Sequence, residues 1–157
     1  MSSRTVSVVP FTISGVKQCI YNTTTGVITT TWGQSLNMIK IIACIESIRV
    51  VDGLEFIVLN DSTGSLAVLH YSDNRDETDL NVLSLTQSVE LKSSSSNIAV
   101  NQYVAVHGTI CFMERERGNP ASHFHLDAKH IRPLQDFNEL TMHMLDAIHT
   151  NIVGMRK

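Results

Sequence analysis

The sequence predicts an all-β barrel followed by one C-terminal amphipathic helix. Five runs rich in Ile, Val and Leu are separated by Gly, Asn, Asp and Ser, a composition typical of strands and turns. A long polar stretch divides the third run from the fourth, and helical spacing of apolar residues follows the last run. With 157 residues and 43% apolar composition, the chain can bury one core, so we expect one domain with an added element.

Residues 1–33 are expected to form an N-terminal extension that packs on the barrel. Val6–Ile13 is β-prone. Val16–Tyr21 and Val27–Trp32 flank the polar tip Asn22–Gly26, and this pattern predicts a small hairpin.

The barrel itself is predicted over residues 34–132. Asp52-Gly53 favours a tight hairpin turn after the first strand. Asn60–Gly64 predicts a second turn, because Asn and Asp bond their own backbone and Gly64 can take a positive φ. The expected strands are Met38–Val51, Leu54–Leu59, Ser65–Tyr71, Gln102–Met113 and His123–Ile131. A long surface connection, 72–101, joins the third strand to the fourth, which matches the five-stranded Greek key of an OB barrel.

Residues 133–157 predict an assembly helix. Pro133 blocks an earlier start, Asp136 is the expected N-cap, and Glu139 completes a capping-box pattern. His143 is expected on the polar face. An apolar stripe spans an arc of roughly 140° at 100° per residue; it contains Phe137, Leu140, Met144, Leu145, Ile148, Ile152 and Met155. The stripe could plug the bottom of its own barrel, but its position and width favour packing against partner helices.

Composition restricts the function classes. Twelve Lys and Arg against fifteen Asp and Glu give a net charge of −3, which disfavours strong nucleic-acid binding by the chain alone. Weak binding within a larger complex remains open, because stacking on aromatic rings needs no net positive charge. Cys19, Cys44 and Cys111 are expected to be small buried hydrophobes rather than disulfide partners. Neither a membrane span nor a secretory signal is expected.

No pattern of an enzyme is found. The sequence has no GxSxG, no phosphate-cradling loop and no cluster of metal-binding carboxylates, so we expect neither catalysis nor a cofactor. His123 and His125 alternate on a predicted strand and His130 lies nearby, but the further ligands of a zinc site are missing. These histidines are expected to form a polar outer face.

Five fragments, in order, resemble the middle subunit of replication protein A, a eukaryotic single-stranded-DNA-binding heterotrimer. They are Val8–Ser14, Ile41–Ile45, Asp61–Gly64, Tyr103–Gly108 and His130–His143, of which the last is the most specific. The resemblance implies a nuclear protein with an OB barrel that binds single-stranded DNA weakly. It also implies a C-terminal helix that joins one helix from each of two partners, the large and small OB-fold subunits.

The same resemblance implies the site residues. The family carries stacking aromatic residues at the end of the third strand and in the fourth strand, where this sequence has Tyr71 and Phe112, with Met113 as a competing register. Strand alternation alone allows Tyr71 to be either a stacking platform or core. Glu46 replaces a residue that is often basic in the family, so it is expected to lower DNA affinity. The candidate backbone-contacting cations are Lys40, Arg49, Arg115, Arg117 and Lys129, although Arg115 and Arg117 could equally form a solvated turn.

Three hypotheses follow. The first is a subunit of a replication protein A-like heterotrimer in DNA replication and repair. The second is a telomere-dedicated paralogue in a CST-like or telomerase-associated trimer, favoured by the acidic balance and by the lack of the family's phosphorylated tail and winged helix, unless these were trimmed. The third is a structural partner-binding module without DNA contact.

Overall fold

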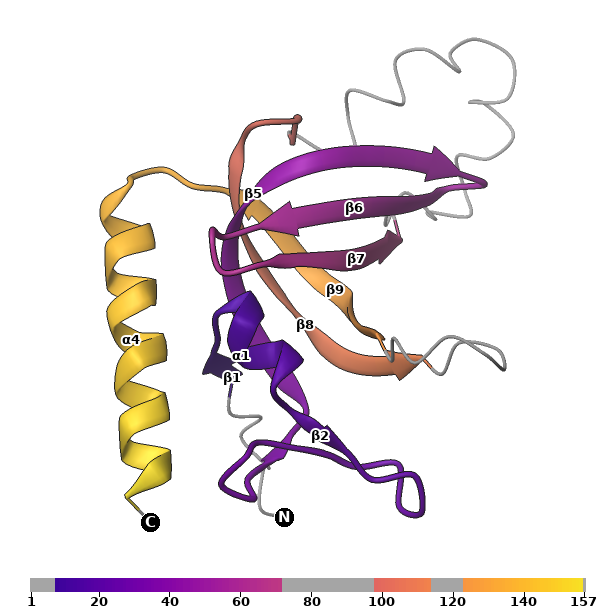
Figure 1. The fold of residues 1–157 in the computed structure, drawn as a ribbon. Helices are drawn as coiled ribbons and strands as arrows, with labels where there is room; N and C mark the ends of the chain where they lie inside the picture. Colours follow the sequence, from indigo (N-terminus) through magenta and orange to yellow (C-terminus); the bar gives the residue numbers. More distant parts are fainter. Residues whose placement is uncertain (1–7, 72–97, 114–122, 157) are drawn as a thin grey trace, which may run out of the picture.

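Five strands close into a barrel in the computed structural model, which describes residues 8–71, 98–113 and 123–156 (Figure 1). The strands are β5 (Met38–Val51), β6 (Leu54–Asn60), β7 (Ser65–Tyr71), β8 (Tyr103–Met113) and β9 (His123–Pro133). Their order is β5-β6-β7-β9-β8, the β5–β8 pairing closes the sheet, and β7 runs parallel to β9. This is the Greek key of an OB fold, so the predicted fold class, barrel and C-terminal helix, is confirmed.

The turn chemistry of the first hairpin is as predicted. Asp52 and Gly53 both have positive φ, 51° and 79°, between the paired residues Val51 and Leu54. A two-residue hairpin turn of type I′ requires positive φ at both central positions, and Asp-Gly adopts this conformation with little strain.

The second turn differs from the prediction, because Ser62 and not Gly64 takes the positive φ, 74°. Two side-chain bonds hold this backbone: Asn60 Oδ1 accepts from the Ser62 N–H at 2.7 Å, and Asp61 Oδ1 accepts from the Thr63 N–H at 2.9 Å. Local bonds of this kind let a non-glycine residue occupy the left-handed region. The expectation for Gly64 was therefore wrong.

The N-terminal segment forms one short strand and then a helix. Strand β1 (Val8–Pro10) pairs parallel with β5, and α1 (Ile13–Lys17) follows, so the β pattern expected through Ile13 was wrong beyond Pro10. The last backbone bond from this segment to β5 is donated by the Phe11 N–H to the Lys40 carbonyl at 3.0 Å. Tertiary contacts then favour the helix, because Asp61 Oδ2 accepts from the Ile13 N–H at 2.8 Å and Thr12 caps the Gly15 N–H at 3.0 Å.

The predicted hairpin after α1 is confirmed, although it is shorter. Strands β2 (Ile20–Tyr21), β3 (Ile28–Thr29) and β4 (Ser35–Leu36) make a three-stranded antiparallel sheet. The third of these strands was not predicted, because two residues carry no periodicity.

One apolar core fills the barrel and extends under α1. Among the described residues its fully buried side chains are mostly β-branched and alternate along the strands; they include Ile39, Ile41, Ile45, Ile57, Leu59, Val68, Val104, Val106 and Leu126. Ile13 and Val16 of α1 belong to the same cluster. Each fully buried side chain of this size stabilises the fold by about 1.5–3 kcal/mol relative to an exposed one. The three cysteines are free, and burial raises the pKa of the Cys19 thiol to about 11.

Helix α4 (Asn138–Met155) stands beside the barrel, next to β1 and β5, rather than across its end (Figure 1). It docks through His143, Ala147 and Gly154. His143 is only 2% exposed, and its Nε2–H donates to the Phe11 carbonyl at 3.0 Å, so the expectation that His143 faces outward was wrong. A Cβ at Gly154 would collide with the Trp32 ring, which shows how closely the helix approaches.

The start of α4 uses the predicted residues in a different arrangement. The Asp136 side chain accepts from the Asn138 N–H at 2.9 Å, whereas Phe137, at the N-cap position, makes no side-chain cap bond. Glu139 does not return to Asp136; it accepts two bonds from Arg132, at 3.1 and 2.5 Å. The helix is thereby tied to the end of β9, and the Arg132 bonds hold the pKa of Glu139 at about 2.

Candidate nucleic-acid and partner surfaces

The end of β7 places Tyr71 on the outer side of the barrel. Its side chain is 56% exposed, while Leu66 and Val68 of the same strand are buried. Tyr71 lies opposite Leu54, which in turn lies opposite Val51, so these three side chains form a row across β5, β6 and β7. Strand alternation allowed Tyr71 to be either core or exposed, and in the structure it is exposed.

A second row runs beside the first. Arg49 lies opposite Phe56 with its guanidinium carbon 5.2 Å from the ring centroid, and Phe56 lies opposite Leu69. A cation over an aromatic face is attracted by about 0.5–1 kcal/mol at an exposed site. The two rows together form what we call the outer-face patch: Arg49, Val51, Leu54, Phe56, Leu69 and Tyr71.

Glu46 occupies the opposite end of the same face. Its carboxylate accepts from Asn60 Nδ2 at 2.6 Å and from Ser65 Oγ at 3.3 Å. These bonds fix a negative charge on β5, and a phosphate approaching this end would be repelled.

Phe112 does not join the outer-face patch. Its ring stacks on Tyr21 with centroids 4.3 Å apart and meets Phe124 edge-on at 5.2 Å, so it packs against the core. Met113, one residue later, is 53% exposed and points outward. Met113, the alternative to Phe112 in this strand, is thus the residue whose side chain is exposed to solvent.

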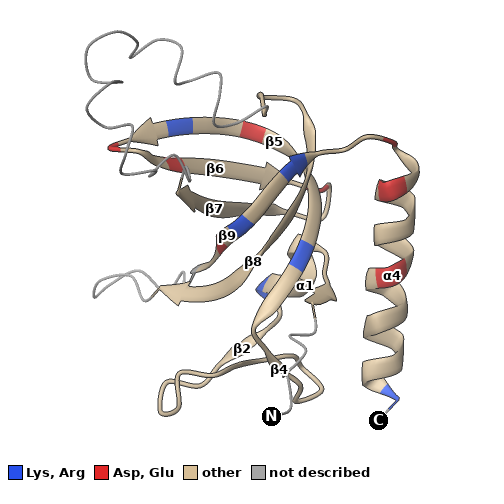
Figure 2. Ribbon diagram, turned by 180° about the vertical axis from the view of Figure 1, so that it is seen from behind, with Lys and Arg blue, Asp and Glu red and all other residues tan. Residues whose placement is uncertain are grey.

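The candidate cations are dispersed. Lys40 and Arg49 are nine residues apart on β5, about 30 Å by strand rise, and Lys40 lies opposite His107 of β8. Lys129 pairs with Asp127 at 3.2 Å. Figure 2 shows Lys and Arg at separate places along β5 and β9, with acidic residues on the same strands. Arg115 and Arg117 lie outside the described residues.

Most of the predicted helix stripe is exposed in this single chain. The exposed members include Phe137, Leu145, Ile148 and Ile152, whereas Leu140 and Met144 at one edge are half-buried. The helix docks on its barrel through a different face, so the stripe is left without a cover among the described residues. Met142 and Val153 are also exposed, on the side of His149 that faces away from the stripe.

Sequence reasoning missed part of the outer-face patch. Val51, Leu54 and Phe56 were assigned only to strands, with no side named. The 2-residue alternation of β6, in which Glu55, Ile57 and Leu59 are buried, was the available signal for Phe56. The alternation did not identify the inward side of β6, because that side carries the charged residue Glu55, which is buried with its carboxylate 3.0 Å from His70 Nδ1.

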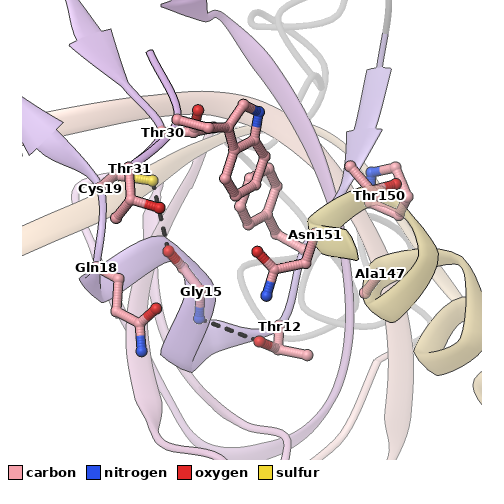
Figure 3. Close-up of a pocket in the computed structure, with 12 residues that line it drawn as sticks. Thr12, Gly15, Gln18, Cys19, Thr30, Thr31, Ala147, Thr150 and Asn151 are labelled. Carbon is pink, nitrogen blue, oxygen red and sulfur yellow. Dashed lines mark hydrogen bonds between the residues drawn. The ribbon is translucent and has the colours of Figure 1, made fainter. Parts of the chain in front are cut away.

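No metal-binding cluster was found in the described part of the chain. No cluster of three or more His, Cys, Asp or Glu could hold a metal ion there. Burial lowers the pKa of His125, and Asp127 opposes that shift, while the His123 side chain lies outside the described residues. A small pocket between α1 and α4 is lined by uncharged residues, among them Thr12, Cys19 and Asn151 (Figure 3). Among the described helices, none is long and apolar enough to cross a membrane.

Comparison with solved structures identifies the same architecture in subunits of known complexes. A chain in a replication protein A heterotrimer bound to single-stranded DNA matches with a TM-score of 0.69 and 20% identity, over 94% of this chain and 98% of that one. A chain of the S. pombe Stn1–Ten1 complex matches with a TM-score of 0.65 and 17% identity, over 92% and 91%. A chain of yeast replication protein A bound to single-stranded DNA matches at 0.63 and 18%, over 96% and 94%.

These similarities show the fold, including its C-terminal helix, over nearly the whole length of each chain. No family model matches the sequence, and a search of curated proteins found no match.

Proposed function

We propose that this protein is a non-catalytic, nuclear subunit of a replication protein A-like heterotrimer. Helix α4 would assemble it with a large and a small OB-fold subunit, and the barrel would add a weak contact to single-stranded DNA in replication and repair. The observation that carries this proposal is the exposed apolar stripe of α4 on a helix already anchored through another face. A stripe of that width is costly to leave in water and fits a helix bundle.

The outer-face patch supports the DNA contact. Tyr71 and Phe56 offer aromatic surface, and Arg49 adds one positive charge beside them. Stacking of a base on an aromatic side chain contributes about 1–3 kcal/mol and tolerates any base sequence. Among the residues that the structure describes, one cation serves this patch and Glu46 opposes phosphate at its far end, so the contact would be weak in the isolated chain.

Co-purification from the native source tests the proposal. We expect two further OB-fold proteins to be identified with the wild-type chain by mass spectrometry. Leu145→Asp should abolish their recovery, because an unpaired charge would be buried in the bundle at a cost of several kcal/mol. His149→Asp, an exposed change outside the stripe, is the matched control. Unchanged recovery of both partners with Leu145→Asp would rule out assembly through α4.

The second candidate function is a telomere-dedicated subunit in a CST-like or telomerase-associated trimer. The similarity to a chain of the Stn1–Ten1 complex supports it as directly as the other similarities support the first. The same co-purification separates the two functions. Recovery of general replication partners alone would exclude the telomeric one, and recovery of telomeric partners alone would exclude the first. A chain that recovers partners but shows no DNA contact in their complex would instead be the structural module.

A further inference from the structure

A group of basic side chains lies away from the outer-face patch, where β5, β8 and β9 meet. Lys40, His107 and His130 lie opposite one another across the three strands. The two imidazole rings have centroids 6.1 Å apart and are tilted by 55°. Arg132 follows two residues after His130 on the same strand. We call these four residues the cationic row.

A β-bulge creates this row. Leu126 and Ala128 are buried, and strict alternation along β9 would bury His130 as well. The register instead shifts, since Gly108 pairs with Ala128 but His107 pairs with His130, which leaves Lys129 as the extra residue. Bulges commonly re-aim a side chain, and here the bulge turns His130 outward beside His107.

Gly108 makes the bulge possible. A Cβ at this position would collide with the Asp127 carbonyl oxygen and press on the backbone of Ala128. The close approach of β9 to β8 therefore depends on a glycine at the point where the register shifts. The pairing of the two histidines is thus built into the backbone and is not an accident of flexible side chains.

The charges around His107 are mainly positive. Burial lowers the pKa of His107, and Lys40, His130 and Arg132 lower it further. Two acids border the row in the described structure. Glu139, at the start of α4, accepts bonds from Arg132 and from the Gln135 N–H at 3.2 Å, and Asp127, three residues before His130 on β9, pairs with Lys129 at 3.2 Å. In the described structure, no anion other than Glu139 lies directly opposite these side chains. An anion placed over the two histidines would therefore meet hydrogen-bond donors and positive charges.

Strand β9 connects the row to the outer-face patch. Asp127 lies opposite Leu69 of the patch, and Arg132 lies five residues further along, about 17 Å by strand rise. The connection includes the Lys129–Asp127 ion pair. A strand of nucleic acid that left the patch along β9 would therefore reach the row without crossing the barrel. This continuity favours nucleic acid over an acidic protein segment.

We propose that the cationic row is a second contact for the phosphate backbone of single-stranded nucleic acid, and that it strengthens as the pH falls below neutrality. This inference rests on the proposed function in one respect only, because both have single-stranded nucleic acid as the ligand. Bound phosphate stabilises the imidazolium form of His107, so binding takes up a proton and affinity rises as the pH falls. Lys40 supplies attraction at every pH.

Fluorescence anisotropy of the full chain with labelled oligothymidylate of about 20 nucleotides, at low and constant ionic strength, tests the row. Wild-type affinity should increase about three- to tenfold between about pH 8 and about pH 5.5. The double variant His107→Gln/His130→Gln should lose most of this increase and match the wild type near pH 8. His149→Gln, an exposed histidine on α4, is the control and should retain the wild-type profile. Thermal melting establishes that each variant is folded.

Two competitors identify the ligand. A peptide nucleic acid of the same bases has no phosphate and should show no histidine-dependent increase. Poly-glutamate is the second competitor. If it displaced the oligonucleotide equally well from the wild type and the double variant, the row would have no role in binding. If it bound the row more tightly than oligothymidylate, the row would be assigned to an acidic protein and the nucleic-acid proposal would be overturned.

The double variant and a patch variant distinguish the two surfaces. An unchanged pH profile in His107→Gln/His130→Gln overturns the cationic row alone. Unchanged affinity in Tyr71→Ala near pH 8, with the pH response intact, overturns the outer-face contact alone. Lys40→Gln should weaken binding at every pH tested and flatten the salt dependence by about one phosphate.

Discussion

Tyr71 and Phe112 illustrate how strand register decides the role of a single aromatic residue. Both were candidates for stacking on bases. Tyr71 lies on the outer side of β7 with more than half of its surface exposed, whereas Phe112 stacks on Tyr21 and packs against the core. We therefore expect a base to stack on the exposed ring of Tyr71 and not on Phe112, whose ring already packs against two others.

Tyr71→Ala and Phe112→Ala should therefore have opposite effects. We expect Tyr71→Ala to weaken DNA binding of the assembled complex by about 1–3 kcal/mol with little change in melting temperature. Phe112→Ala should leave a cavity and reduce the free energy of unfolding by about 3 kcal/mol, with DNA affinity of the folded fraction unchanged. Melting temperature and DNA affinity, measured side by side for both variants, check this. A large drop in melting temperature for Tyr71→Ala with intact affinity would remove Tyr71 from the site.

His143 predicts how docking of α4 responds to pH. Burial lowers the pKa of His143 below its ordinary value of 6.5, with Lys40 adding to the shift and the Phe11 carbonyl, Asp146 and Asp61 opposing it. The unfolded chain therefore binds a proton that the folded chain resists, so the free energy of unfolding falls as the pH drops below about 6.5.

His143→Gln should reduce this acid sensitivity, because glutamine cannot take up a proton yet can donate to the Phe11 carbonyl. The measurement is thermal melting between about pH 7.5 and about pH 5, the range around histidine titration. His107 and His125 also have lowered pKa values and contribute with the same sign, so the difference between wild type and variant is the informative quantity. Parallel pH curves for the two proteins would contradict a role for His143.

At the scale of elements, the β8–β9 pair depends on a glycine. Gly108→Ala places a methyl group on the Asp127 carbonyl and should cost more than about 2 kcal/mol, because the obstructing atom is backbone and cannot rotate away. Gly64→Ala is the matched control: its Cβ would meet neighbours no closer than 3.4 Å, so we expect a change below about 1 kcal/mol. Chemical denaturation of both variants checks the pair, and equal stability would show that β9 can move aside.

The junction between β9 and α4 is an ion pair whose loss is predictable. The Arg132 bonds lower the pKa of Glu139 to about 2, so this contribution is complete above the ordinary carboxyl pKa of 4.5 and disappears as the pH falls towards 2. Glu139→Gln should remove that part of the acid dependence while leaving the barrel folded. Far-ultraviolet circular dichroism at 222 nm follows the helix, and an acid transition identical in wild type and variant would refute the assignment.

For the whole molecule, we expect charge to limit the affinity for DNA. The net charge of −3, the fixed Glu46 carboxylate and the separation of Lys40 from Arg49 all oppose strong binding by one barrel. We expect the isolated chain to bind single-stranded DNA feebly at physiological salt. A sub-micromolar dissociation constant under those conditions, measured by anisotropy, would show that the outer-face patch and the cationic row act together more strongly than their charges indicate.

The sequence by itself determined the barrel, its hairpins and the helix. Ile- and Val-rich runs, the Asp52-Gly53 turn and the apolar spacing after Pro133 act within a few residues of chain, and local chemistry of that kind can be recognised without a structure. The five expected barrel strands agree with the observed ones to within two residues at each end, whereas the β runs expected before residue 33 are longer than the observed strands. The exposed stripe of α4 was predicted for the same reason.

Tertiary structure decided what those elements present to their surroundings. α1 is helical because Asp61, far along the chain, binds its first N–H, and His143 is buried because Phe11 supplies a carbonyl. The cationic row exists because Gly108 admits a bulge that turns His130 outward. Each outcome depends on a partner brought close only by folding, and neither periodicity nor propensity encodes the identity of such a partner.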